Sequence, residues 1–340
     1  MNKIAVITGA GAGVGRATAL EFARQGWDVA LLSRDPARLE SLAGEIEALG
    51  CRALPIPTDV ADAEAVDAAA ERVEVELGPI KAWINVAMAT VFAPVSELTA
   101  AEALRATEVT YLGQVYGMMA ALRRMRSRNR GVIVNVGSAL CYRSVPLQSV
   151  YCGAKAAIRG FTDSLRSEIL HDKLDIRLTM VHLPAVNTPQ FDWALNKTGH
   201  MAMPVPPIYQ PEVPARAIYF AATHHRREVW VGFPTVKAIL GNRVAPGLID
   251  RYLASAGYSG QLSDRAQPAD APNNLFSPVP GHDTSHGRFD DRARTSSPEM
   301  FTDRHKDAVY GGLAAVALLA VGAFVAQRRR GARWQLLADR

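Results

Sequence analysis

The start of the chain joins a short apolar run to a helical pattern through a turn rich in glycine. Residues 3–8 are typical of a buried strand and residues 17–23 of a helix. The turn has the spacing T-G-x-x-x-G-x-G and includes Thr8, Gly9, Gly13, Val14 and Gly15. Glycine lets the backbone approach a phosphate closely, and the following helix attracts a pyrophosphate to its N-terminus. This unit predicts a dinucleotide-binding α/β fold, although a glycine turn alone also fits a simple strand-to-helix loop.

A second group of residues lies near the middle of the chain. Tyr151 and Lys155 form a Y-x-x-x-K pair, and residues four apart share one face of a helix. An ammonium near a phenol favours the phenolate, so the sequence predicts a lowered pKa for Tyr151 and proton exchange with a carbonyl or alcohol oxygen. Ser138 ends the buried-strand pattern of residues 131–138, which would place its hydroxyl at the carboxyl end of that strand. A Y-x-x-x-K pair alone is usually a solvated helix face, but its spacing to Ser138 and to the glycine turn favours a catalytic role.

Apolar runs and helical patterns alternate along most of the chain, from residue 3 to about residue 185. This alternation indicates an α/β fold with a Rossmann-like, doubly wound parallel sheet. Residues 97–125 and Tyr151–Leu170 are expected to form long helices. We therefore expect a single catalytic domain over residues 1–255.

The glycine turn and the spacing of Ser138, Tyr151 and Lys155 together resemble the short-chain dehydrogenase/reductase superfamily, over roughly residues 1–250. The resemblance implies a Rossmann-like domain that binds a nicotinamide dinucleotide through the glycine turn. It also implies that Ser138 orients the substrate oxygen, that Tyr151 is the acid or base, and that Lys155 also binds the nicotinamide ribose. Two long helices in this superfamily pack against partner subunits, so a homodimer or homotetramer is expected.

Other positions match or depart from the pattern of this superfamily. The resemblance assigns further cofactor contacts to Asp59, Val60, Asn85, Ala87, Val186 and Thr188. Met88 replaces the last glycine of the usual N-N-A-G motif, and Thr110 replaces an asparagine that helps to hold a water in the proton relay to the lysine. Either the hydroxyl of Thr110 or the backbone carbonyl at that position would hold the water. These departures affect the relay more than they affect cofactor binding.

The end of the second expected strand bears on which nicotinamide cofactor binds. Enzymes that use NAD usually place an acidic residue there for the ribose 2′-hydroxyl. Ser33 and Arg34 occupy this position, and a guanidinium suits a 2′-phosphate. Asp35 is expected to cap the helix that begins at Pro36. The sequence therefore predicts NADP rather than NAD, unless Arg34 is an ordinary surface arginine.

Charge and cysteine content narrow the class of protein. The chain has 340 residues, a net charge of +5 and 49% hydrophobic residues. Many of its arginines lie within residues 122–130, where no aromatic residues alternate with them as in a nucleic-acid groove, so nucleic acid is not an expected partner. Cys51, Cys141 and Cys152 lack the spacing of metal ligands and indicate reduced thiols in the cytoplasm. No metal site is expected.

The character of the chain changes towards its C-terminus. Residues 187–214 are rich in proline and aromatic residues and stand where the superfamily has its substrate lid. Residues 256–307 are poor in large apolar residues and predict a disordered linker. Residues 308–326 carry no charge and are just long enough to span a bilayer, and a basic tail of residues 327–340 follows. The sequence predicts a cytoplasmic catalytic domain attached to the inner membrane, or alternatively a C-terminal helix that is amphipathic or docked on the domain.

Together these observations predict an NADP-dependent oxidoreductase that interconverts a carbonyl and an alcohol, with hydride transfer at the nicotinamide and proton transfer by Tyr151. The aromatic lid and the apolar tail favour a small hydrophobic substrate. One alternative is a catalytically idle NADP-binding protein that regulates a membrane partner, an idea suggested by Thr110 and Met88. A lyase or epimerase on the same scaffold is a third reading.

Overall fold

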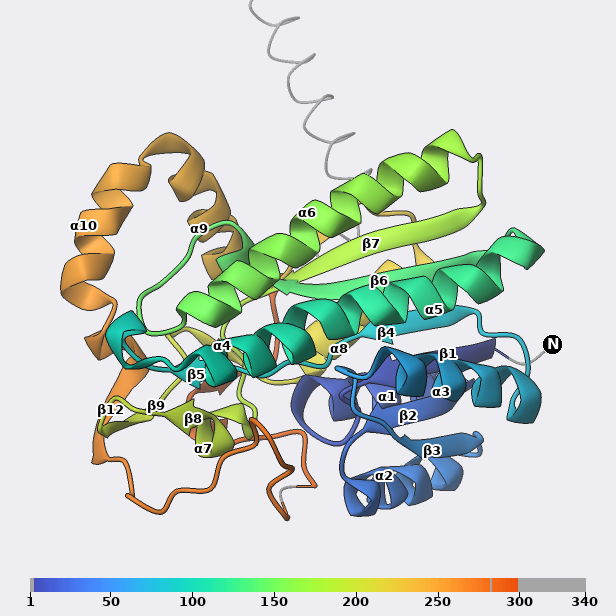
Figure 1. Ribbon diagram of the computed structural model, residues 1–340, viewed down its shortest axis with the longest axis horizontal. Coiled ribbons are helices and arrows are strands. Elements are labelled where there is room, and N and C mark those ends of the chain that lie inside the picture. Colours follow the sequence, from blue (N-terminus) through green and yellow to red (C-terminus); the bar gives the residue numbers. More distant parts are fainter. Residues whose placement is uncertain (1–2, 282, 299–340) are drawn as a thin grey trace, which may run out of the picture. The chain divides into compact units, whose positions relative to one another are not determined.

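The centre of the protein is a seven-stranded parallel sheet (Figure 1). The computed structural model describes residues 3–281 and 283–298. In spatial order the strands are β11 (Glu228–Trp230), β7 (Ile176–Leu183), β6 (Gly131–Ser138), β4 (Ala82–Asn85), β1 (Lys3–Thr8), β2 (Trp27–Ser33) and β3 (Ala53–Pro57). Each neighbouring pair is parallel, and the order reverses at β1. The Rossmann-like, doubly wound sheet predicted from the sequence is therefore confirmed.

The central strands are buried on both faces, which explains their continuous apolar sequences. Every residue of β6 is buried, and so is every residue of β1 after Lys3. Parallel strands covered by helices on both sides have no solvent face, so hydrophobic and polar residues do not alternate along them.

Two layers of helices provide this cover. On one side, α8 (Glu212–Thr223) packs on α1 (Gly13–Arg24), which also contacts α2 (Pro36–Ala48). On the other side lie α3 (Ala63–Glu76), α5 (Gly113–Arg128) and α6 (Ser149–His171), and Figure 1 shows α5 and α6 running across the sheet. The predicted cap of α2 is confirmed, because the Asp35 carboxylate accepts hydrogen bonds from the N–H groups of Ala37 and Arg38.

The long helix expected over residues 97–125 is interrupted near its middle. A capping box of Thr99 and Glu102 starts α4 (Ala100–Thr107), and a π-helical turn over Glu108–Leu112 then joins α4 to α5. Such turns are rare and are often found at functional sites.

The chain between β7 and α8 forms a set of short elements beside the sheet. They are α7 (Gln190–Trp193), β8 (Leu195–Asn196), β9 (His200–Ala202) and β10 (Ile208–Tyr209), and β8 pairs with β5 (Val91–Phe92). After β11 come α9 (Phe233–Val244) and α10 (Pro246–Ala256). The short elements from α7 to β10 lie within residues 187–214, the region expected to form a substrate lid.

The segment after α10 contributes strands to that region. Antiparallel pairing joins β12 (Leu262–Ala266) to β9, and parallel pairing joins β13 (Ala293–Arg294) to β10. The compact unit therefore extends to Ser297 and does not end near residue 255. For residues 256–281 and 283–298, the prediction of a disordered linker is wrong.

A few well-spaced contacts hold this segment, which is why its composition was misleading. Leu275, Val279 and Phe289 are buried, although they are spaced along a segment that is rich in polar residues, proline and glycine. Arginines of the sheet domain add hydrogen bonds to its backbone carbonyls, for example from Arg38 to Gly281. Low average hydrophobicity therefore does not exclude ordered packing when anchors are placed at intervals.

Within residues 3–281 and 283–298, no helix combines the length and the apolar character that crossing a membrane requires. Residues 308–326 and the basic tail of residues 327–340 lie outside the described residues, so the membrane segment stays a prediction.

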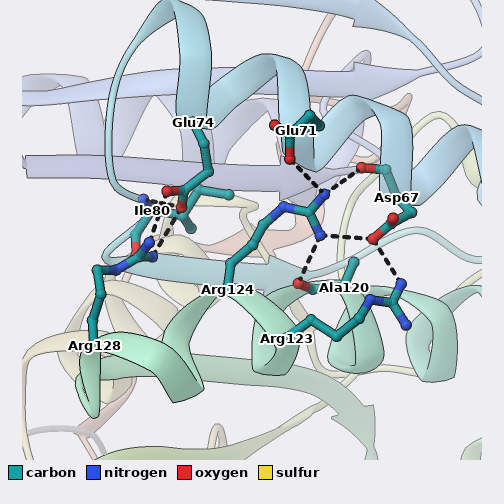
Figure 2. Close-up of polar contacts among 8 residues, drawn as sticks. All are labelled: Asp67, Glu71, Glu74, Ile80, Ala120, Arg123, Arg124 and Arg128. Carbon is teal, nitrogen blue, oxygen red and sulfur yellow. Dashed lines mark hydrogen bonds and ion pairs between the residues drawn. The ribbon is translucent and has the colours of Figure 1, made fainter.

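Three arginines at the end of α5, Arg123, Arg124 and Arg128, pair with carboxylates of α3 (Figure 2). Arg124 contacts the side-chain and backbone oxygens of Asp67 at 2.6 and 2.9 Å and the carboxylate of Glu71 at 3.3 Å. Arg128 makes two contacts to Glu74, at 2.7 and 2.9 Å. Hydrogen bonds from Arg124 and Arg123 lower the pKa of Asp67. This part of the basic run therefore fastens two helices together.

Replacing Arg124 with alanine should lower the free energy of unfolding by about 1–2 kcal/mol, because its side chain is only 12% exposed and bridges two helices. Arg123→Ala is the matched control: this side chain binds the same Asp67 but is 52% exposed, so the loss should stay below about 0.5 kcal/mol. Urea denaturation of the two variants measures the difference, and equal losses would contradict this role of Arg124.

Candidate functional site

A cavity of about 470 Å³ lies at the carboxyl end of the sheet. Residues at the ends of six of the parallel strands, or in the loops that follow them, line this cavity. The predicted site residues that line it are Gly9, Gly13, Val14, Gly15, Ser33, Arg34, Asp59, Val60, Ala87, Ser138, Tyr151, Lys155, Val186 and Thr188. Thr8, Asn85 and Thr110 are not among the lining residues. The cavity spans the point where the strand order reverses, which is where ligands bind in open parallel sheets.

The glycine turn is closely packed against the strand ends around it. Gly9 has φ +68°, and a Cβ there would lie 2.8 Å from Cα of Ala87. A Cβ at Gly15 would lie 2.0 Å from the carbonyl oxygen of Gly9. Side chains are excluded at both positions, so the turn packs closely against the strand ends. Within the turn, the N–H of Gly13 donates to the carbonyl oxygen of Thr284 at 3.0 Å.

Tyr151 and Lys155 lie on α6 and reach the cavity together with Ser138 at the end of β6. The Lys155 ammonium lies 5.6 Å from the centre of the Tyr151 ring. It donates a hydrogen bond of 2.6 Å to the carbonyl oxygen of Val136, which also accepts one of 3.1 Å from the side-chain amide of Gln114. The Y-x-x-x-K pair is therefore directed into the fold.

The pKa of Tyr151 differs from the sequence-based expectation. Burial raises it well above its usual value, and the nearby Cys141 raises it further, while the hydroxyl of Ser138 opposes the change. Burial also lowers the pKa of Lys155 to about 8. The prediction of a lowered pKa for Tyr151 is wrong for this structure, because burial of the phenol raises that pKa. Tyr151 is therefore a neutral phenol near pH 7.

A buried polar cluster supports the end of β6 beneath Ser138. The backbone N–H of Ser138 donates to Sγ of Cys141 at 3.3 Å, and Nδ1 of His182 lies 3.2 Å from the Ser138 carbonyl oxygen. The other ring nitrogen of His182 lies 3.5 Å from the carboxylate of Glu228, which also accepts from Tyr142. No group of three His, Cys, Asp or Glu among the described residues is arranged to hold a metal ion.

The contacts of His182 and Glu228 indicate a buried ion pair. Burial alone would lower the pKa of His182, but its contacts with Cys141 and Glu228 raise it to about 9. Although burial raises the pKa of Glu228, the nearby ring of His182 and a hydrogen bond from Trp230 hold it at about 2. The imidazolium can then donate from both ring nitrogens, one of them to the backbone of Ser138.

Thr8 and Asn85 occupy structural positions and not the cofactor surface that the resemblance implied. The hydroxyl of Thr8 accepts hydrogen bonds from the N–H groups of Val86 and Ala87, at 3.0 and 3.2 Å. The amide of Asn85 donates to Asn135 at 2.9 Å and accepts from the indole of Trp83 at 2.8 Å. Both side chains are buried and join neighbouring strands. They position the lining residue Ala87 without facing the cavity.

Thr110 also differs from its expected place. Its hydroxyl accepts from the N–H of Ala89 at 2.8 Å and donates to the carbonyl of the same residue at 2.7 Å. The single hydroxyl proton is therefore used, and the side chain is fully buried outside the cavity lining. The contacts give the Thr110 hydroxyl a structural role, and its part in the relay, through the hydroxyl or through the backbone carbonyl, stays a prediction. Thr110 links the π-helical turn to the loop after β4.

The far end of the cavity carries two arginines. Arg34, at the end of β2, donates to the carbonyl oxygens of Asn274 and Phe276 at 2.5 and 3.1 Å. Arg38, one helical turn later, donates to Gly281 at 2.6 Å and lies 4.5 Å from the centre of the Trp193 ring. Both arginines line the cavity beside Ser33 and Asp59.

Sequence reasoning missed several lining residues, namely Arg38, Gln148, Trp193, Asn274 and Pro278. Arg38 left a signal, because it lies in the first turn of the helix that begins directly after Arg34 and Asp35. Asn274 and Pro278 left none, since they belong to the segment whose composition predicts disorder.

A family model and a relative both match most of the part of the chain that forms the sheet and the cavity. A family model described as short chain dehydrogenase matches residues 3–198. The uncharacterized oxidoreductase YxnA of Bacillus subtilis (strain 168) is 30% identical over 271 residues, which cover 78% of this chain and 75% of YxnA.

Two solved structures have similar folds. A short-chain dehydrogenase from Streptomyces avermitilis has a TM-score of 0.63 and 26% identity, over 76% of this chain and 98% of the other. An alcohol dehydrogenase from the archaeon Thermococcus sibiricus, complexed with 5-hydroxy-NADP, has a TM-score of 0.59 and 25% identity, over 68% of this chain and 96% of the other.

Thr110→Val should lower the free energy of unfolding by about 2 kcal/mol, because it leaves the buried N–H and carbonyl of Ala89 without the hydroxyl. Thr110→Ser keeps the hydroxyl and should lose much less. Chemical denaturation compares them. If Thr110→Val kept full stability but turned over slowly, the hydroxyl would have a catalytic role and the structural interpretation would fail.

The His182–Glu228 pair should make stability depend on pH. Because folding raises the pKa of His182 from 6.5 to about 9, its contribution is complete below pH 6.5 and is lost as the pH rises through about 9. Lys155 acts in the opposite sense, since its pKa is lowered. The test is therefore the difference between wild type and His182→Gln in urea denaturation, which should shrink between pH 6 and pH 9.5. A difference that is constant over this range would rule out a charged His182.

Proposed function

Because the chain belongs to the short-chain dehydrogenase/reductase superfamily of oxidoreductases, we propose that it uses NADP to interconvert a carbonyl and an alcohol, with Tyr151 as the proton donor and acceptor. The observation that carries this proposal is the convergence of Ser138, Tyr151 and Lys155 on a single cavity that the glycine turn also lines. Their separation in the sequence makes this convergence a property of the fold.

The side chains divide the chemistry among themselves. A nicotinamide cofactor supplies or accepts the hydride when it is bound. Tyr151 is a neutral phenol near pH 7, which is the form that gives a proton to a carbonyl oxygen as the alcohol forms. The Ser138 hydroxyl accepts a hydrogen bond from the N–H of Leu140, which leaves its own proton for the substrate oxygen. The Lys155 ammonium provides positive charge beside the phenol.

The residues at the cavity suit a nicotinamide dinucleotide along its length. The N–H groups of the glycine turn suit the pyrophosphate, and Lys155 and Thr188 border the nicotinamide end. At the other end, Ser33 and Arg34 replace the acidic residue that would select NAD. The 5-hydroxy-NADP bound by the Thermococcus sibiricus enzyme agrees with a preference for NADP.

The apolar part of the cavity lining favours an apolar substrate. It includes Phe92, Val145, Leu183, Phe191, Met203, Val205, Pro234 and Ala238. An aliphatic or cyclic ketone would bury its hydrocarbon against these side chains and direct its oxygen to Ser138 and Tyr151.

Two departures from the superfamily pattern suggested a catalytically idle nucleotide-binding protein, and the fold explains one of them. Thr110 differs from the superfamily pattern, but it serves the fold through Ala89. Met88 lines the cavity and is the remaining departure.

Tyr151→Phe should keep its affinity for NADPH and lose turnover by roughly 100-fold to 10,000-fold, because the ring remains while the proton donor is removed. Tyr219→Phe makes the same change on α8, where the ring packs against Phe22, and should leave turnover unchanged. Oxidation of NADPH with a panel of apolar ketones measures both variants. Full activity of Tyr151→Phe would refute the mechanism.

We also propose that residues 308–326 attach the protein to the membrane. At 1.5 Å per residue, nineteen helical residues extend about 28 Å, which is near the thickness of the hydrocarbon core. A chain that ends at residue 298 keeps the contacts of Arg34 and Arg38 and should stay active, but should leave the membrane fraction. Recovery of full-length protein in the soluble fraction without detergent would contradict the proposal.

A further inference from the structure

We propose that residues 274–281, which we call the strap, hold Arg34 and Arg38 in place for the 2′-phosphate of NADP and thereby determine the preference over NAD. This inference rests on the proposed function and assigns a specificity role to a segment far from the family motifs in sequence. The matching family model ends at residue 198, so the strap lies beyond it.

The strap presents a row of backbone carbonyls to the two guanidinium groups. Arg34 donates to Asn274 at 2.5 Å through one terminal nitrogen, and to Leu275 and Phe276 at 3.4 and 3.1 Å through the other. Arg38 donates through Nε to Gly281 at 2.6 Å and through a terminal nitrogen to Val279. The strap thus fixes the direction of both side chains.

These contacts orient the guanidinium groups without neutralising them. A carbonyl oxygen is a neutral acceptor, and a guanidinium has five N–H groups, of which the strap uses only part. Both arginines also line the cavity, so they face the strap on one side and the ligand space on the other. Two oriented cations at one end of the cavity suit a phosphate monoester, which carries up to two negative charges.

The charges around Arg34 also favour binding of an anion there. Asp35 forms an ion pair with Arg38 and Asp59 forms one with Arg105, while Arg34 forms none with a carboxylate among the described residues. Burial lowers the pKa of Arg34, and the charges of Arg105 and Arg38 lower it further against the opposing effect of Asp59. An added anion would therefore relieve repulsion between cations at this position.

The strap is anchored on both sides of the cavity. The side chain of Leu275 is fully buried in the main hydrophobic core, and its carbonyl oxygen also accepts a hydrogen bond of 3.1 Å from Arg105. The N–H of Asn274 donates to the carbonyl of Trp193 at 2.8 Å, and the ring of Trp193 lies against Arg38. Loss of the Leu275 anchor should therefore free the carbonyls that hold Arg34.

The test compares the dissociation constants of NADPH and NADH for the full chain and for Leu275→Ser. We expect NADPH to bind about tenfold more weakly to the variant, since charge-assisted contacts to the phosphate are lost, while NADH changes less than about twofold. The matched control is Leu170→Ser near the end of α6. Leu170 is 71% exposed, so this substitution should change neither dissociation constant. Leu275→Val, which keeps an apolar anchor, should lie close to wild type.

A double-mutant cycle then asks whether the strap acts through the arginine. In an Arg34→Gln background, Leu275→Ser should cause little further loss of NADPH affinity, because the group that it positions is gone. Full additivity would overturn the proposal.

Other results overturn it as well. They are equal losses for NADPH and NADH in Leu275→Ser, unchanged NADPH affinity, or tighter NADPH binding, which would mean that the strap competes with the phosphate. A wild-type protein that bound neither nucleotide would instead refute the proposed function, so the two failures are distinguishable.

Discussion

Burial of the Lys155 ammonium is the constraint on which the arrangement of the site depends. Its side chain is 1% exposed, and a buried charge costs several kcal/mol unless hydrogen bonds compensate for lost hydration. The Val136 carbonyl provides that compensation, and the amide of Gln114 holds the same oxygen. The end of β6, the start of α5 and the first turns of α6 are therefore kept at a fixed spacing. Ser138 and Tyr151, which are close neighbours of Val136 and Lys155 along the chain, take their positions from it.

The sequence predicted the cavity lining well wherever a residue must be close to the ligand for reasons of backbone geometry. Gly9 and Gly15 belong to this class, because their spacing reflects contacts that exclude a Cβ. The prediction that Thr8, Asn85 and Thr110 belong to the site differs from the structure, because none of them lines the cavity. A motif locates such residues at a strand end or in a helix but does not say which way the side chain points. All three turn into the protein, where each satisfies backbone or amide groups that would otherwise be buried without partners.

The fold could be predicted as far as the last helices because strands and helices up to that point have apolar residues at regular, recognisable spacings in the sequence. The segment after α10 has no such period. Its order comes from Leu275, Val279 and Phe289, which are spaced without a regular period, and from arginine side chains that lie more than two hundred residues earlier. Contacts of this kind depend on the finished sheet, and a local reading of composition cannot detect them.

The distance in sequence between Arg34 and its carbonyl partners, from 240 to 242 residues, has a consequence for how the protein assembles. Contacts between residues far apart in a chain form late, since the intervening loop must first lose its conformational freedom. During synthesis the sheet, whose last strand ends at Trp230, can form before the strap at residues 274–281 has left the ribosome. A nascent chain at that stage has strands, helices and glycine turn in place, but its nucleotide cleft lacks an outer wall. Emergence of the strap, and not formation of the sheet, is therefore the step that completes the lining of the cavity.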